Sequence, residues 1–169
     1  MFPQFRENAL QMVLFALMTF PSTYFDISLC VSRSTTIATD RKRRVRQAAL
    51  DILAVLGQIS STKIVMDIVQ KISSEENEND TNLVVAVKAR LSRKQLPIVT
   101  ADGNVQYAMR IPLSNATTAP YIFGADVDWI VAGVGSVSPT SMKRRAAMFQ
   151  STKPDYKNVE NNYEEKPER

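Results

Sequence analysis

The stretch DRKRRVRQAALDILAVLG, residues 40–57, decides the fold class, because it carries the clearest helical pattern in the chain. Its apolar side chains recur every three or four residues, which places them in one stripe along a helix of 3.6 residues per turn. We expect Asp40 to cap the start of this helix with its carboxylate, and Gly57 to end it. The members of the stripe are Val45, Ala48, Ala49, Ile52, Leu53 and Leu56.

Residues of the same character recur along the chain at a spacing of 40. The series that keep this spacing are Phe5, Val45 and Val85; Ala9, Ala49 and Ala89; Asp40 and Asp80; and Arg6 and Arg46. A repeat of about 40 residues that contains two helices is typical of HEAT and armadillo proteins, in which stacked units complete one another's core. The alternative is a plain bundle whose helices are equally spaced by chance.

The acidic and basic members of this pattern suggest a structural role. In a stack of units, an Asp ahead of a helix and an Arg six residues later can form a ladder, in which each Arg reaches the Asp of a neighbouring unit. Asp40, Arg46 and Asp80 stand at such positions. We therefore interpret Arg46 as a structural residue in preference to a ligand contact.

Helical periodicity predicts further helices on both sides of the opening stretch. They span residues 6–20, 23–31, 62–72 and 81–94. The first is so apolar that we expect neighbours to cover it on more than one side. Residues 34–36, Ser-Thr-Thr, are poor helix formers and are expected to fray into a turn. Ser60 or Ser61 is placed to cap the third of these helices, and an acidic polar loop, residues 73–80, follows it.

The character of the chain changes after Lys94. Alternating apolar and polar residues around Asp102-Gly103, a type I′ turn signal, predict a hairpin over residues 98–113 or an extended arm laid along the helices. The stretch GADVDWIVAG, residues 124–133, holds Trp129 and is a candidate docking segment. A brief helix with Lys143, Arg144 and Arg145 is expected in residues 139–150. Residues 151–169 are polar, and we expect disorder there.

The predicted fold class is all-α, a partial HEAT/armadillo-like superhelix of about two and a half repeats followed by an extended, partly disordered C-terminal region. The predicted parts are the repeat domain in residues 1–95, the extended segment in 96–135 and the tail in 136–169.

Composition excludes several classes of function. Hydrophobic residues make up 44% and charged residues 22% of the chain, as in a globular protein. The absence of His and the single Cys leave no Ser-His-Asp triad and no transition-metal ligand set. We therefore expect no enzymatic activity, no metal, no cofactor and no small-molecule substrate. The net charge of +4 permits an acidic partner without requiring one.

The apolar N-terminal stretch, residues 9–20, also bears on targeting. It is too short to span a bilayer comfortably, and it lacks the basic flank and cleavage site of a signal peptide. A buried helix is the preferred interpretation and a signal peptide the alternative. No membrane partner is expected.

The residues DRKRRVRQAALDILAVLG resemble a HEAT repeat of the kind found in TOG domains, the tubulin-binding modules of microtubule regulators. Together with KARLSRKQLPIVTADGNVQYAMRIP and GADVDWIVAG, they are most similar to the TOG-array regulators of axonemal microtubules, or crescerin family. The resemblance implies a regulator of ciliary microtubules that binds tubulin or microtubules through loops between HEAT helices. It further implies a location in the cytoplasm and cytoskeleton, at the cilium and axoneme. At most three units fit this chain, so it is expected to correspond to a C-terminal piece of a TOG domain with its trailing segment.

In that family the loops ahead of the second helix of each unit contact tubulin, and here these are residues 1–4, 39–44 and 73–80. Because tubulin is acidic, the resemblance implies contact through the basic second loop. Its candidate tubulin-binding residues are Arg41, Lys42, Arg43 and Arg44. The alternatives are a solvated loop, and a nuclear-import or nucleic-acid patch, which is less favoured. At the level of function, the alternative is a generic HEAT adaptor that binds another protein through a helical face.

Overall fold

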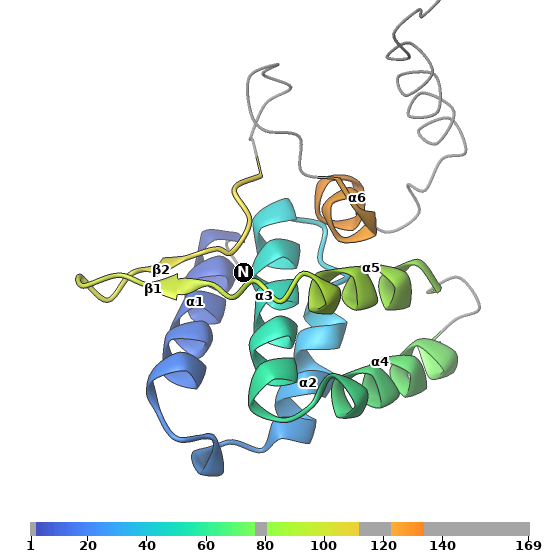
Figure 1. The fold of residues 1–169 in the computed structure, drawn as a ribbon. Coiled ribbons are helices and arrows are strands. Elements are labelled where there is room, and N and C mark those ends of the chain that lie inside the picture. Colours follow the sequence, from blue (N-terminus) through green and yellow to red (C-terminus); the bar gives the residue numbers. More distant parts are fainter. Residues whose placement is uncertain (1–2, 77–80, 112–122, 134–169) are drawn as a thin grey trace, which may run out of the picture. The chain divides into compact units, whose positions relative to one another are not determined.

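Six α-helices and one short hairpin make up the part of the chain that the structure describes (Figure 1). The structure is a computed structural model that describes residues 3–76, 81–111 and 123–133, which belong to one compact unit, Met1–Val137. The helices are α1 (Pro3–Thr19), α2 (Ile27–Ile37), α3 (Arg43–Ile59), α4 (Thr62–Glu76), α5 (Thr81–Ser92) and α6 (Ala125–Ala132). A single 3₁₀ turn, Ser22–Tyr24, joins α1 to α2, and the hairpin pairs β1 (Ile98–Val99) with β2 (Val105–Gln106).

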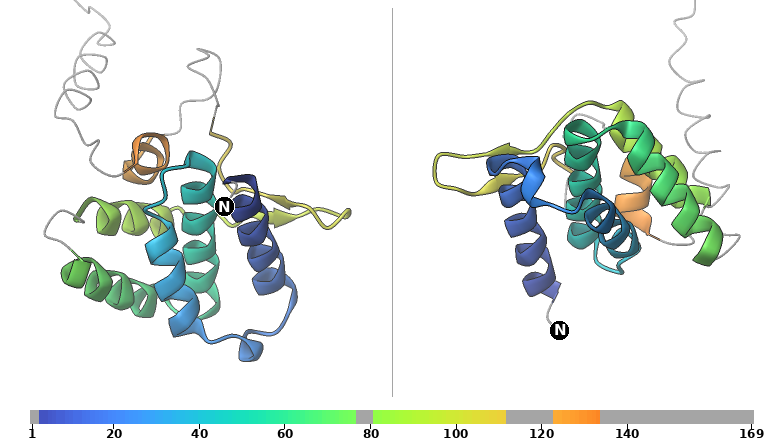
Figure 2. Two further views of the ribbon diagram at one scale, coloured as in Figure 1. Left: turned by 180° about the vertical axis from the view of Figure 1, so that it is seen from behind. Right: turned by 90° about the horizontal axis from the view of Figure 1, so that it is seen from below.

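Helix α3 is the centre of the unit. It packs against α1, α2, α4, α5 and α6, and every residue from Val45 to Gly57 is buried. Figures 1 and 2 place α3 between α1 on one side and α5 on the other. The apolar stripe predicted from residues 40–57 therefore lies in the core, as the helical period requires.

The helices pack as a stack of repeating pairs. Helix α2 packs on α3 and α4 on α5, while α2 contacts α4 and α3 contacts both α1 and α5. Helices α1, α3 and α5 thus form one layer, which α2 and α4 cover on one side. This arrangement confirms the predicted all-α, HEAT-like class.

Helix α2 differs from its prediction in both position and length. It begins at Ile27 behind Asp26, whose carboxylate accepts a 2.9 Å hydrogen bond from the amide of Leu29, and it continues through the Ser-Thr-Thr stretch that was expected to fray. The two threonine hydroxyls of this stretch bond back to the helix itself. For example, Thr35 Oγ1 donates to the carbonyl of Val31 at 2.8 Å. Hydroxyls that bond one turn back no longer compete with the helical backbone.

Both predicted ends of α3 are wrong by about one turn or less. The helix begins at Arg43, and Asp40 instead accepts the amide of Lys42 at 2.7 Å, within the preceding turn. At the other end, Gly57 lies inside the helix, which continues to Ile59. A Cβ at Gly57 would come within 2.7 Å of the Leu91 side chain, so this glycine allows close packing of α5.

Helix α1 is less covered than predicted. Leu10, Leu14 and Leu17 point into the core, but the opposite face is open. The large apolar side chains exposed on that face and at its end are Phe5, Met12, Val13 and Phe20. The expectation that neighbours cover this helix on more than one side is therefore wrong for the described residues.

The structure agrees with the predicted cap at Ser61 and with the predicted hairpin, but not with the predicted turn type. Ser61 Oγ accepts the amide of Ile64 at 3.1 Å and so caps α4, which continues to Glu76 through residues expected to form a loop. The hairpin closes with a bond from the Gly103 amide to the Thr100 carbonyl, and Gly103 alone of the turn residues has a positive φ. A type I′ turn would need two such residues, so that turn type is wrong. The predictions for Asp80, for residues 139–150 and for residues 151–169 fall outside the described residues.

Candidate protein-interaction site at the start of α3

The basic residues of the opening stretch lie on the turn between α2 and α3 and on the first turn of α3. Arg41 and Lys42 are exposed, while Arg43 and Arg44 are half-buried. Burial and the adjacent charge of Arg44 lower the pKa of Arg43. The structure thus brings the four predicted residues together on one short segment.

A fifth basic residue, Arg110, lies beside this segment. Arg44 and Arg110 both line an open cavity of about 430 Å³, together with Tyr107 and Gln106. The Arg44 guanidinium also lies 5.8 Å from the centre of the Tyr107 ring, within range of a cation–π interaction. Arg110 is exposed and far from Arg44 in sequence, so the basic surface is larger than the sequence indicated.

The segment that carries Arg110 is held against α3 by buried hydrogen bonds. Gln47 Nε2 donates to the carbonyl of Met109 at 2.7 Å, and the amide of Ala108 donates to Asp51 Oδ2 at 3.0 Å. On the α1 side, the Tyr107 hydroxyl donates to Glu7 Oε1 at 3.0 Å, and burial together with Glu7 raises the pKa of that hydroxyl. These bonds fix residues 107–109, which immediately precede Arg110.

Asp51 also forms a buried ion pair that the sequence analysis missed. Its Oδ1 accepts Arg90 Nε at 2.9 Å, and the side chains of both residues are almost fully buried, at 0% and 1% exposed. Burial raises the pKa of the Asp51 carboxyl, while Arg90 and the Ala108 amide oppose that shift. The pair joins α3 to α5. In the sequence, the only indication of this pair is one charged residue on each of two apolar helices.

Two residues of the predicted ladder, Asp40 and Arg46, have partners of different kinds. Arg6 on α1 forms an ion pair with Asp40, which links α1 to the turn before α3. The Arg46 guanidinium, in contrast, is buried among backbone carbonyls of the turn and of α6. Asp80 lies outside the described residues.

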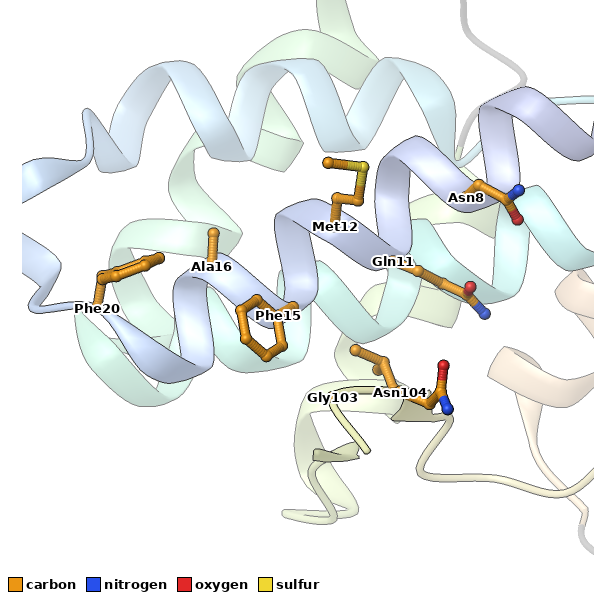
Figure 3. Close-up of a pocket in the computed structure, with 9 residues that line it drawn as sticks. Asn8, Gln11, Met12, Phe15, Ala16, Phe20, Gly103 and Asn104 are labelled. Carbon is orange, nitrogen blue, oxygen red and sulfur yellow. The ribbon is translucent and has the colours of Figure 1, made fainter. Parts of the chain in front are cut away.

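A second cavity lies between α1 and the hairpin. It measures about 640 Å³, and Figure 3 shows Phe15 extending from α1 toward Gly103 and Asn104. Met12 and Phe20 add apolar surface to its lining.

Within the described residues, no group of three or more acidic, Cys or His residues could hold a metal ion. A search of the same residues finds no helix long and apolar enough to cross a membrane.

Comparison with known proteins gives consistent matches. The chain is 37% identical over 132 residues to the human TOG array regulator of axonemal microtubules protein 1, covering 76% of this chain and 8% of that protein. It is 30% identical over 145 residues to the Crescerin-like protein che-12 of Caenorhabditis elegans, covering 82% of this chain and 11% of that protein. No protein-family model matches.

One solved structure also matches, from work described as "Crescerin uses a TOG domain array to regulate microtubules in the primary cilium". It superposes with a TM-score of 0.54 and 34% identity, covering 63% of this chain and 43% of that chain. The chain therefore spans a small part of the length of these curated relatives and less than half of the solved chain.

Proposed function

The chain is homologous to the TOG domains of the crescerin family, and from this homology we propose that it binds tubulin and takes part in organising ciliary microtubules. The homology to TOG-array regulators agrees with the prediction that the chain is not an enzyme. The proposed location is the cytoskeleton, at the cilium and axoneme. The observation that carries the proposal is the basic segment presented at the start of α3.

We place the tubulin contact on Arg41, Lys42, Arg43 and Arg44, with Arg110 as an additional member. The three exposed members, Arg41, Lys42 and Arg110, can meet an acidic surface without first being uncovered. The side chain of Arg44 is held near Tyr107, so less conformational freedom is lost when it binds. Such a surface speeds encounter with an acidic partner, and its contribution weakens as salt screens the charges.

The test is a double charge reversal, Arg41→Glu with Lys42→Glu, measured by co-sedimentation with microtubules and by binding to free tubulin at two salt concentrations. We expect binding to fall at least about tenfold, since opposed charges become like charges. The matched control is Lys63→Glu with Lys71→Glu, which makes the same charge change at exposed positions on α4. Equal binding by the two double variants would contradict the proposed site.

A generic adaptor is the second candidate, and the exposed apolar face of α1 favours it. A contiguous apolar surface of this kind is typical of protein contacts. Under this alternative, Met12→Glu would abolish partner binding while the charge reversal at the start of α3 would leave it unchanged. The proposed tubulin contact predicts the opposite ranking of the two variants.

A further inference from the structure

Helix α6 contacts the turn that leads into the basic segment through the side chain of Trp129. The indole Nε1 donates a 2.8 Å hydrogen bond to the carbonyl of Ala38, the C-cap residue of α2. Carbonyls at the end of a helix lack intrahelical donors and need partners from elsewhere. Trp129 is only 4% exposed, so it is both a packing residue and the donor that satisfies this carbonyl.

The guanidinium of Arg46 forms the second link between the turn and α6. Its Nη1 donates to the carbonyls of Asp40 and Arg41, at 2.8 Å and 2.9 Å. Its Nε donates to the carbonyls of Trp129 and Ile130 near the end of α6, at 3.0 Å and 3.1 Å. One buried cation therefore holds the backbone of the turn and the C-terminal end of α6 at the same time.

Both ends of α6 show that this docking is specific. At the C-terminal end, Gly133 has a φ of +76°, and a Cβ there would lie 3.0 Å from Arg46 Nη1. Glycine is thus required both by the backbone and by the close approach of the guanidinium. At the N-terminal end, Arg93 Nη2 donates to the buried carboxylate of Asp126 at 2.8 Å.

We propose that α6 is a positioning element for the basic segment. Docking of α6 through Trp129 and Arg46 fixes the backbone of residues 38–41, and this fixes how Arg41 and the residues after it face an acidic protein surface. The identity of that surface as tubulin rests on the proposed function. Because coupling between two sites is reciprocal, a partner bound at the basic segment must also stabilise the docked state of α6.

The first test measures hydrogen exchange by mass spectrometry on the full chain with the substitution Trp129→Phe. Phenylalanine keeps an apolar ring but removes the Nε1–H donor. We expect faster deuterium uptake in peptides covering residues 37–42 and 125–133, with α1 and α4 unchanged. The matched control is Val131→Ala, at an exposed position of the same helix, which should leave both peptides unchanged. Faster uptake in α6 alone, or in neither peptide, would overturn the inference.

Gly133→Ala provides a second variant that reaches the same contact through Arg46 rather than Trp129. The added methyl group meets the guanidinium and strains the backbone, so exchange should again increase in both peptides. Circular dichroism verifies that each variant keeps its helices. If Gly133→Ala undocks α6 and residues 37–42 keep wild-type protection, the turn does not depend on α6.

The second test measures the affinity of the Trp129→Phe variant for free tubulin. We expect it to fall between about twofold and tenfold, the range expected for loss of one net hydrogen bond. In the unmodified chain, added tubulin should slow exchange in residues 125–133. Unchanged affinity despite a loosened turn, or unchanged exchange in α6 on binding, would overturn the positioning role. If the unmodified chain does not bind tubulin, the proposed function fails, and the exchange experiments without tubulin still decide whether α6 holds the turn.

Discussion

Helices α1 and α3 stand at equivalent positions of the repeat, yet among the described helices only α3 has a neighbour in its layer on each side. Met12 is 73% exposed, whereas Ile52, which lies 40 residues later, is fully buried. Phe5 and Val45 differ in the same way, at 59% and 1% exposed. Apolar side chains at equivalent repeat positions are therefore exposed or buried according to whether a neighbouring helix packs on them. In a repeat protein, sequence predicts which face of a helix is apolar, and the neighbouring unit decides whether that face is buried.

The largest effect should come from the polar position that the two helices share. Asp51 on α3 is buried and paired with Arg90, while Gln11, at the equivalent position of α1, is half-buried. Arg90→Ala would leave the Asp51 carboxylate buried without its partner, and should lower the free energy of unfolding by about 3–5 kcal/mol. Urea denaturation measures this loss. Gln11→Ala, at the position of α1 that corresponds to Asp51, is the comparison variant, for which we expect a loss of about 1 kcal/mol or less. Similar losses in both variants would contradict the claim that stacking makes the two positions different.

The next largest effect should come from truncating the apolar side chain at one repeat position, which Ile52 occupies in α3 and Met12 in α1. Ile52→Ala should lower the free energy of unfolding by about 2–5 kcal/mol, because it removes buried methyl groups and leaves a cavity in the core. Met12→Ala should change it by no more than about 0.5 kcal/mol, since most of that side chain is in solvent. Thermal and urea unfolding of the two variants give the ratio. A large loss for Met12→Ala would show that the outer face of α1 is covered in solution.

The smallest effect concerns the contact that joins α1 to the turn before α3. Arg6→Ala removes the ion pair with Asp40, in which the Arg6 side chain is 37% exposed. A partly exposed pair is screened by solvent, so we expect a loss of about 1 kcal/mol or less in the free energy of unfolding. The loss should shrink further at high salt. Arg33→Ala, at an exposed position of α2, is the control. A loss that does not depend on salt would assign the role of Arg6 to packing of its aliphatic stem.

Sequence reasoning recovered the features that local pattern determines. The stripe from Val45 to Leu56 has an unbroken helical period, so its place in the core could be predicted from spacing alone. The cap at Ser61 and the hairpin around Gly103 depend on side-chain and backbone preferences of single residues, and they were also predictable. Extending α2 through residues 34–36 required knowing that the threonine hydroxyls would bond back to the helix. Helix propensity alone does not indicate this.

Features that depend on distant contacts were missed. Nothing local marks Asp51 and Arg90 as partners, and nothing near Arg110 indicates that it lies beside Arg44. Arg46 was assigned a structural role, but its backbone partners on α6 could not be foreseen, because the docked position of α6 depends on the tertiary fold. The exposed face of α1 was missed for a related reason, since periodicity describes the helix and not its surroundings.

The hydrogen bonds that hold residues 107–109 also have a consequence for how the chain folds during synthesis. Met109 is bonded to Gln47 across 62 positions, Ala108 to Asp51 across 57, and Tyr107 to Glu7 across 100. Contacts between such distant positions form late, because closing long loops costs conformational entropy before any contact is gained. Until residues 107–109 leave the ribosome, Gln47 and Asp51 in the middle of α3 lack these backbone partners. The stack therefore acquires its final stability only when the segment that follows the repeats has been made.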